Sequence, residues 1–196
     1  MIKAVYDTLP EILRTTCTLE ESSKDSEHKT SMSNSSLKVV DFDKIPKKYA
    51  KQAMIRTVPK SNDALYITKE NKWIFIEFKN GEVKKEEIYR KLYDSLIMLE
   101  ELAIKDWNFF RNHATYILVY NEDVYCQRNA KLQKSKNRDA LYQHIRNRAN
   151  TVRNLYEIRK LEGFLFENAW TYNEEQFAKF FEKRYETEEA GEVCVS

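Results

Sequence analysis

The amino-acid sequence predicts a single α/β domain with a small central mixed sheet flanked by helices. A chain of 196 residues is long enough for one domain with its own core, and no Pro/Gly-rich linker divides it. It holds only three Gly and three Pro, so few tight turns are available, which favours long helices over an all-β sandwich. Two β-rich runs, at 64–68 and 73–78, precede a helical pattern over 83–104.

The N-terminal segment predicts one helix and one loop. Residues 7–19 are expected to form a short helix that begins with a capping box between Thr8 and Glu11. Residues 20–36 carry a single large apolar side chain, Met32. Because such a stretch buries too little surface to offset its ordering entropy, we predict a mobile polar loop there.

The next segment predicts strands. Residues 37–42 are expected to form a short strand, and 46–55 a helical turn. Two β-prone runs follow, Ala64–Thr68 and Trp73–Phe78, separated by a polar turn; Asn80-Gly81 supplies a second turn. The two runs therefore predict a hairpin.

The second half of the chain predicts helices around one or two more strands. Residues 83–104 have apolar side chains at spacings of three and four, the pattern of a helix with one buried face. Residues 115–120 are expected to form a strand and 130–160 a long polar helix. A last strand over 164–170 and a last helix over 173–185 complete an added C-terminal region.

Composition excludes several classes of protein. The net charge is only +2, which argues neither for nor against binding to nucleic acid. Cys17, Cys126 and Cys194 are an odd number at wide spacing, which matches neither a disulfide framework nor a zinc motif and favours a reducing compartment. The sequence shows no signal peptide and no apolar run long enough to span a bilayer, so we expect a cytoplasmic protein without membrane contact.

Three charged residues are expected to meet at one end of the hairpin. Side chains alternate along a strand, so Glu77 and Lys79 lie on the same face, about 6.6 Å apart. Asp63 comes directly before the preceding strand, with 13 residues between it and Glu77. Two carboxylates can hold a hard cation such as Mg²⁺, and the ammonium can stabilise charge on a phosphate. The structural alternative is a salt bridge between Glu77 and Lys79.

These residues resemble the PD-(D/E)XK nuclease family over about residues 60–120. The shared features are Asp63, then Glu77-Phe78-Lys79 at the end of a strand, then a long helix. The resemblance implies an αβββαβ core within 37–120. It also implies Asp63 and Glu77 as ligands of Mg²⁺ (or Mn²⁺), the backbone carbonyl of Phe78 as a further ligand, and Lys79 as the catalytic lysine.

The sequence departs from the family pattern in two places. The residue before Asp63 is Asn62 rather than proline. The family often adds a glutamate from its first helix, for which Glu11 and Glu20 are the candidates, although Glu11 also fits the expected capping box.

A basic segment predicts contact with a phosphate backbone. Residues 128–160 contain ten Lys or Arg and two Asp or Glu, a net charge of +8. The alternative is a solvated helix face. The basic segment belongs to a C-terminal region at 128–186, which also holds the last strand and helix, and an acidic tail at 187–196 follows. The candidate phosphate-binding residues are Lys131, Lys134, Lys136, Arg138, Arg146, Arg148 and Arg153.

The sequence thus favours a Mg²⁺-dependent nuclease that hydrolyses phosphodiester bonds, of DNA rather than RNA. Many nucleases of this type act as dimers, so a homodimer is compatible with this hypothesis. The first alternative is a catalytically inert module that keeps the nuclease fold and binds nucleic acid or a protein. The second is an interaction protein with an exposed apolar surface in place of a charged cleft.

Overall fold

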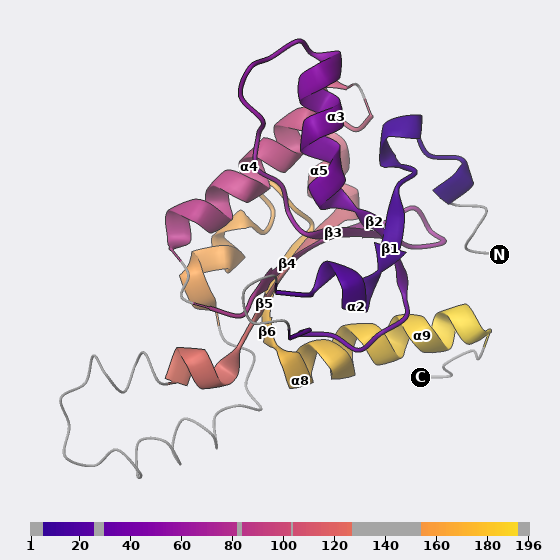
Figure 1. Ribbon diagram of the computed structural model, residues 1–196. Helices are drawn as coiled ribbons and strands as arrows, with labels where there is room; N and C mark the ends of the chain where they lie inside the picture. The colour runs from indigo at the N-terminus through magenta and orange to yellow at the C-terminus, as the bar shows by residue number, and fades with distance from the viewer. Residues whose placement is uncertain (1–5, 26–29, 82–83, 103, 127–153, 192–196) are drawn as a thin grey trace.

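The computed structural model describes residues 6–25, 30–81, 84–102, 104–126 and 154–191 (Figure 1). In these ranges the strands form one mixed sheet whose spatial order follows the chain order. Neighbouring strands are antiparallel from the first to the fourth, and the last three are parallel to one another. The predicted α/β class is confirmed. The six strands are β1 Thr16–Thr18, β2 Lys38–Asp41, β3 Ala64–Ile67, β4 Trp73–Lys79, β5 Ala114–Tyr120 and β6 Asn168–Asn173.

Helices cover both faces of the sheet, which gives three layers (Figure 1). One face packs against α3 Ile45–Gln52, α4 Lys85–Glu101, α5 Trp107–His113 and the 3₁₀ turns η1 Glu11–Leu13, η2 Phe42–Lys44 and η3 Leu155–Leu161. The other face packs against α2 Leu19–Ser22, α8 Glu174–Phe177, the π-helical turn η4 Ala178–Glu182 and α9 Lys183–Ala190. No helix in the described ranges is long and apolar enough to cross a bilayer.

Alternation along β4 divides the core between the two faces. Phe75 points to the α4 face, where its ring meets those of Phe42, Phe110 and Phe166 edge to face. The neighbours of Phe75 in the chain point to the α9 face. Glu77 is two residues further along, so it enters the same side as Phe75 and is carried into the larger half of the core.

The long helix α4, followed by α5, connects β4 to the parallel strand β5. Ile88, Leu92 and Leu96 are fully buried, as their spacing predicts. Tyr93 and Ile97, which would widen this apolar face, are instead exposed, at 36% and 43%. The buried stripe is therefore narrow, and it fixes which side chains of α4 face the sheet.

The N-terminal segment differs from the sequence prediction. Residues 7–19 hold the turn η1 and the strand β1 instead of one helix, and the capping box joins Thr18 to Glu21. The main-chain N–H of Glu21 donates to Thr18 Oγ1 at 3.1 Å, and that of Thr18 donates to Glu21 Oε2 at 2.8 Å.

The segment 20–36, predicted as a mobile loop, is partly buried where the structure describes it. Met32, Ser33 and Ser35 are buried. Ser23 Oγ accepts from the main-chain N–H of Ser33, and Ser33 Oγ accepts from that of Ser35. Serine hydroxyls here replace the regular hydrogen bonds of a helix or sheet, and hydropathy alone does not reveal this.

The C-terminal region agrees with the prediction only in outline. The last strand is β6, which begins at Asn168 and not at Phe164, because 163–166 turn back toward Leu161 through main-chain hydrogen bonds. Helical structure follows from 174 to 190, close to the predicted 173–185 and into the expected acidic tail. The predicted helix over 130–160 lies largely outside the described residues.

Candidate metal centre

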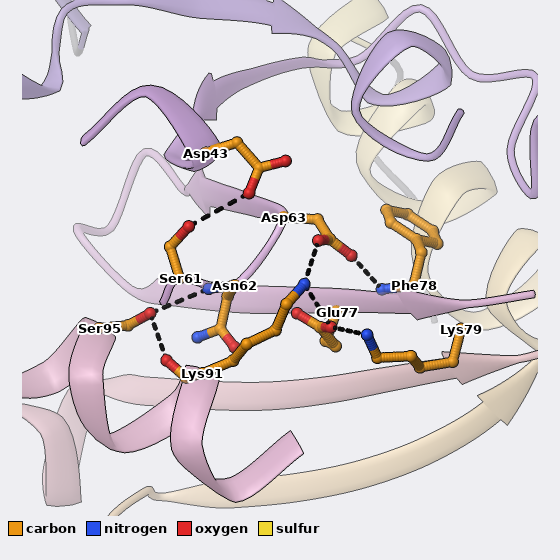
Figure 2. A network of polar contacts seen from close by, with 9 residues as sticks. All are labelled: Asp43, Ser61, Asn62, Asp63, Glu77, Phe78, Lys79, Lys91 and Ser95. Atoms are coloured by element: carbon orange, nitrogen blue, oxygen red, sulfur yellow. Dashed lines mark hydrogen bonds and ion pairs between the residues drawn. The ribbon is translucent and has the colours of Figure 1, made fainter. Parts of the chain in front are cut away.

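The β3–β4 hairpin brings Asp63 beside the end of β4. The register pairs Ala64 with Ile76, and the main-chain N–H of Asp63 donates to the carbonyl of Ile76 at 3.2 Å. Asp63 therefore lies across from the stretch that contains Glu77 and Lys79. The structure brings together the three residues that the sequence singled out (Figure 2).

Glu77 is the most deeply placed member of the site. Its side chain has no exposed surface, and its Oε1 lies 2.7 Å from Lys79 Nζ and 2.8 Å from Lys91 Nζ. Its Oε2 has no hydrogen-bond partner among the described residues. Burial, with the nearby charge of Asp63, raises the pKa of Glu77 to about 7, against the opposing effect of the two lysines.

Each carboxylate oxygen of Asp63 has its own partner. Its Oδ2 accepts a hydrogen bond from the main-chain N–H of Phe78 at 2.6 Å. Its Oδ1 lies 2.8 Å from Lys91 Nζ. Strand pairing between β3 and β4 ends at Ile76, and the N–H and C=O of a strand residue point to the same side, so the carbonyl of Phe78 also faces the Asp63 side.

Lys91 is the member of the site that sequence reasoning missed. Its ammonium lies between the two carboxylates, 2.8 Å from an oxygen of each (Figure 2). Burial lowers the pKa of Lys91, but the attraction of Asp63 and Glu77 outweighs it and leaves that pKa above its usual value. One signal was available, because position 91 falls between Ile88 and Leu92 on the buried stripe of α4, where an unpaired lysine is costly.

Hydrogen bonds join α4 to the start of the hairpin at this point. Ser95 Oγ accepts from the main-chain N–H of Asn62 at 2.9 Å and donates to the carbonyl of Lys91 at 2.7 Å. The side-chain amide of Asn62 is buried without a hydrogen-bond partner among the described residues. The main chain of α4 is thus fixed where it supplies Lys91.

A cleft of ≈ 960 Å³ opens onto the site. Asp63, Phe78, Lys79 and Lys91 line it at one end, whereas Glu77 lies behind them. Asp43 also lines it; burial and the charge of Asp63 raise the pKa of Asp43, and its Oδ1 accepts from Ser61 Oγ at 3.2 Å. The lining also includes Ser22 and Ser23, at the end of α2, and Asn121.

No protein-family model, curated protein or solved structure matches the chain.

The oxygen atoms at the site fit a hard divalent cation. Asp63 and Glu77 supply carboxylates, Phe78 supplies a carbonyl on the same side, and Glu77 Oε2 is a buried acceptor without a donor. Among the described residues, no three His, Cys, Asp or Glu side chains gather to hold a metal ion, and Asp63 and Glu77 are a pair of carboxylates. A site of this kind suits Mg²⁺, which keeps several waters.

The two glutamates that the sequence suggested as a further ligand lie away from the cleft. Glu11 and Glu20 are exposed and do not line the cleft. The seven basic residues from Lys131 to Arg153 lie outside the described residues.

Proposed function

We propose that the chain is a Mg²⁺-dependent nuclease. The observation that carries this proposal is the convergence of Asp63, Glu77 and Lys79 at the end of β4, where a cleft opens. The order of elements supports it, because the antiparallel strands β2, β3 and β4 precede α4 and the parallel strand β5, as in the αβββαβ core of PD-(D/E)XK nucleases; α3 between β2 and β3 and the extra strand β1 are additions to that order. The short helix α2 precedes β2 in the chain.

Each residue of the site has a role in this proposal. Asp63, Glu77 and the carbonyl of Phe78 would hold the cation, for which Mn²⁺ is a substitute. A bound Mg²⁺ would supply a Lewis acid that activates water and neutralises charge on a phosphate. Lys79 lines the cleft and pairs with Glu77, so its ammonium can orient the attacking water or stabilise negative charge that develops on the phosphate.

The substrate in this proposal is a nucleic acid, DNA in preference to RNA. The basic residues between 128 and 160 would supply backbone contacts, because neutralised phosphates are the main source of affinity in such complexes. Two copies of the chain acting as a dimer would allow both strands to be cut.

One observation favours the alternative, an inert module with a nuclease-like fold. Both carboxylates already lie beside ammonium groups, Lys91 beside both and Lys79 beside Glu77, so the site is electrostatically balanced without a metal ion. In that case the network would stabilise the fold, and binding of nucleic acid or a protein would use other surfaces.

Cleavage assays separate the two functions. The purified chain is incubated with linear, circular and single-stranded DNA and with RNA, in Mg²⁺, Mn²⁺ or EDTA. Glu77→Gln and Lys79→Met remove the proposed groups. Glu70→Gln and Lys72→Met are matched controls from the turn at the far end of the hairpin.

If the chain is a nuclease, the unchanged chain and both controls should cleave in the presence of metal and not in EDTA. The cleavage rate of each site variant should be at least about 100-fold lower. Equal rates for all five proteins would mean that any cleavage comes from a contaminant. Absence of cleavage together with retained DNA binding would favour the inert module.

A further inference from the structure

Lys91 occupies the place from which a cation would bind both carboxylates. Among the described residues, it is the cation within ion-pair distance of both Asp63 and Glu77, whereas Lys79 contacts Glu77. We propose that Lys91 is a tethered counter-ion that competes with the metal ion, so that metal binding moves its ammonium off Asp63 and Glu77 and into the cleft. This inference rests on the metal site proposed above.

Lys91 holds one oxygen of each carboxylate. Asp63 Oδ2 is engaged by the N–H of Phe78, which leaves Oδ1, the oxygen beside Lys91 Nζ. Glu77 presents Oε1 to the same ammonium. A metal ion that uses Asp63 Oδ1 and Glu77 Oε1 needs the two atoms that now neutralise Lys91, and one that uses Glu77 Oε2 instead still competes with Lys91 for the Asp63 oxygen.

The route to Glu77 leads past the lysines. Glu77 has no exposed surface and does not line the cleft, whereas Lys79 and Lys91 do. An ion that enters from the cleft meets these ammonium groups first. Mg²⁺ binds oxygen at about 2.0–2.1 Å, which would put a double positive charge beside the ammonium, and like-charge repulsion then drives Lys91 away.

Lys91 can leave without moving its helix. Its carbonyl is fixed by Ser95 Oγ, and Ser95 in turn holds the main chain of Asn62. The side chain is a flexible four-carbon stem, 21% exposed, which already lines the cleft. Rotation of this stem transfers the ammonium from the carboxylates to the space where a substrate phosphate would lie.

The arrangement also explains how two acidic side chains stay together without a metal ion. The two carboxylates face two ammonium groups, so the folded chain contains no uncompensated buried charge at this point. Removal of Lys91 should therefore weaken the metal-free protein and strengthen metal binding, two effects of opposite sign that a purely structural salt bridge does not produce.

The test compares the unchanged chain with Lys91→Met and with the control Lys85→Met, on the same helix but paired with Glu157. Mg²⁺ affinity is measured by calorimetry, and melting temperature is measured in EDTA and in Mg²⁺. Lys91→Met should bind Mg²⁺ about tenfold more tightly, melt lower in EDTA and gain more from Mg²⁺ than the unchanged chain. The control should match the unchanged chain.

Unchanged or weaker Mg²⁺ affinity in Lys91→Met, with binding intact in the unchanged chain, would overturn the role of Lys91 alone. Lack of Mg²⁺ binding by both proteins would overturn the metal site and this inference together. Should Lys91→Met not fold, NMR of the lysine ammonium groups in the unchanged chain decides the question. The Lys91 signal should shift on Mg²⁺ addition toward that of a solvent-exposed lysine, and an unmoved signal would contradict displacement.

Discussion

Asp63 accepts a hydrogen bond from the main-chain N–H of Phe78 at 2.6 Å. Phe78 lies between Glu77 and Lys79 in the chain. This bond therefore fixes the carboxylate of Asp63 beside the strand residues that carry the carboxylate of Glu77 and the ammonium of Lys79. Asp63 consequently has two separable tasks, closing the end of the hairpin with one oxygen and offering the other to a cation.

Two substitutions at Asp63 separate these tasks. Asp63→Asn keeps an oxygen for the N–H of Phe78, whereas Asp63→Ala leaves that donor unpaired. Both should weaken Mg²⁺ binding by more than about tenfold. Asp63→Ala should also lower the free energy of unfolding by about 1–3 kcal/mol relative to Asp63→Asn. Calorimetry and urea denaturation measure the two effects, and equal stability of the variants would show that the bond to Phe78 contributes little.

Magnesium affinity should depend on pH through Glu77. Burial raises its pKa to about 7, from an ordinary value of 4.5. Only the ionised carboxylate binds the cation, so affinity should rise about tenfold from pH 6 to pH 8.

The stability of the metal-free protein should change with pH in the opposite direction to the Mg²⁺ affinity. Between pH 4.5 and 7 the folded chain keeps a proton on Glu77 that the unfolded chain has lost, so stability from this group falls as pH rises. Melting curves in EDTA should therefore show the unchanged chain losing stability relative to Glu77→Gln from pH 5 to pH 7.5.

Either measurement can contradict the raised pKa of Glu77. For the affinity, the contradicting result is a Mg²⁺ affinity that stays level from pH 6 to pH 8.

The hairpin and its charged end were predictable because both depend on residues that are close together in the sequence. Alternation in 73–79 places Glu77 and Lys79 on one face, and a short polar turn returns the chain to Asp63. Lys91 was not predictable in the same way. Its contact with Asp63 depends on how α4 is rotated and placed on the sheet, and that is decided by packing of the whole buried stripe.

The N-terminal segment shows a second reason why a prediction from sequence can be wrong. Residues 20–36 are poor in apolar side chains, and composition therefore predicts a loop. In the structure, Met32 is buried and the hydroxyls of Ser23 and Ser33 satisfy neighbouring main-chain groups. Whether serine hydroxyls point to water or to the backbone is a tertiary outcome, and hydropathy carries no signal for it.

Phe75 should contribute strongly to stability because it joins the sheet to the helical layer that carries Lys91. Its ring is fully buried and meets three other aromatic rings. Phe75→Ala should lower the free energy of unfolding by about 3–5 kcal/mol. Phe180→Ala, at a phenylalanine that is 45% exposed, should cost under about 1 kcal/mol. Urea denaturation compares them, and similar losses would contradict the assigned core.

Ser95 should matter both for stability and for the position of Lys91. It is fully buried and links the N–H of Asn62 to the carbonyl of Lys91. Ser95→Ala would leave the buried N–H of Asn62 without its acceptor, at a cost of about 1–3 kcal/mol, whereas the exposed Ser36→Ala should be nearly neutral.

The two roles of Ser95 can be measured separately. Hydrogen exchange at the amide of Asn62 should accelerate in Ser95→Ala, because that amide loses its partner. If the serine also fixes the main chain from which Lys91 turns, Mg²⁺ affinity should change in Ser95→Ala but not in Ser36→Ala. A loss of stability with unchanged Mg²⁺ affinity would restrict Ser95 to packing, and the position of Lys91 would then be set by its ion pairs with Asp63 and Glu77.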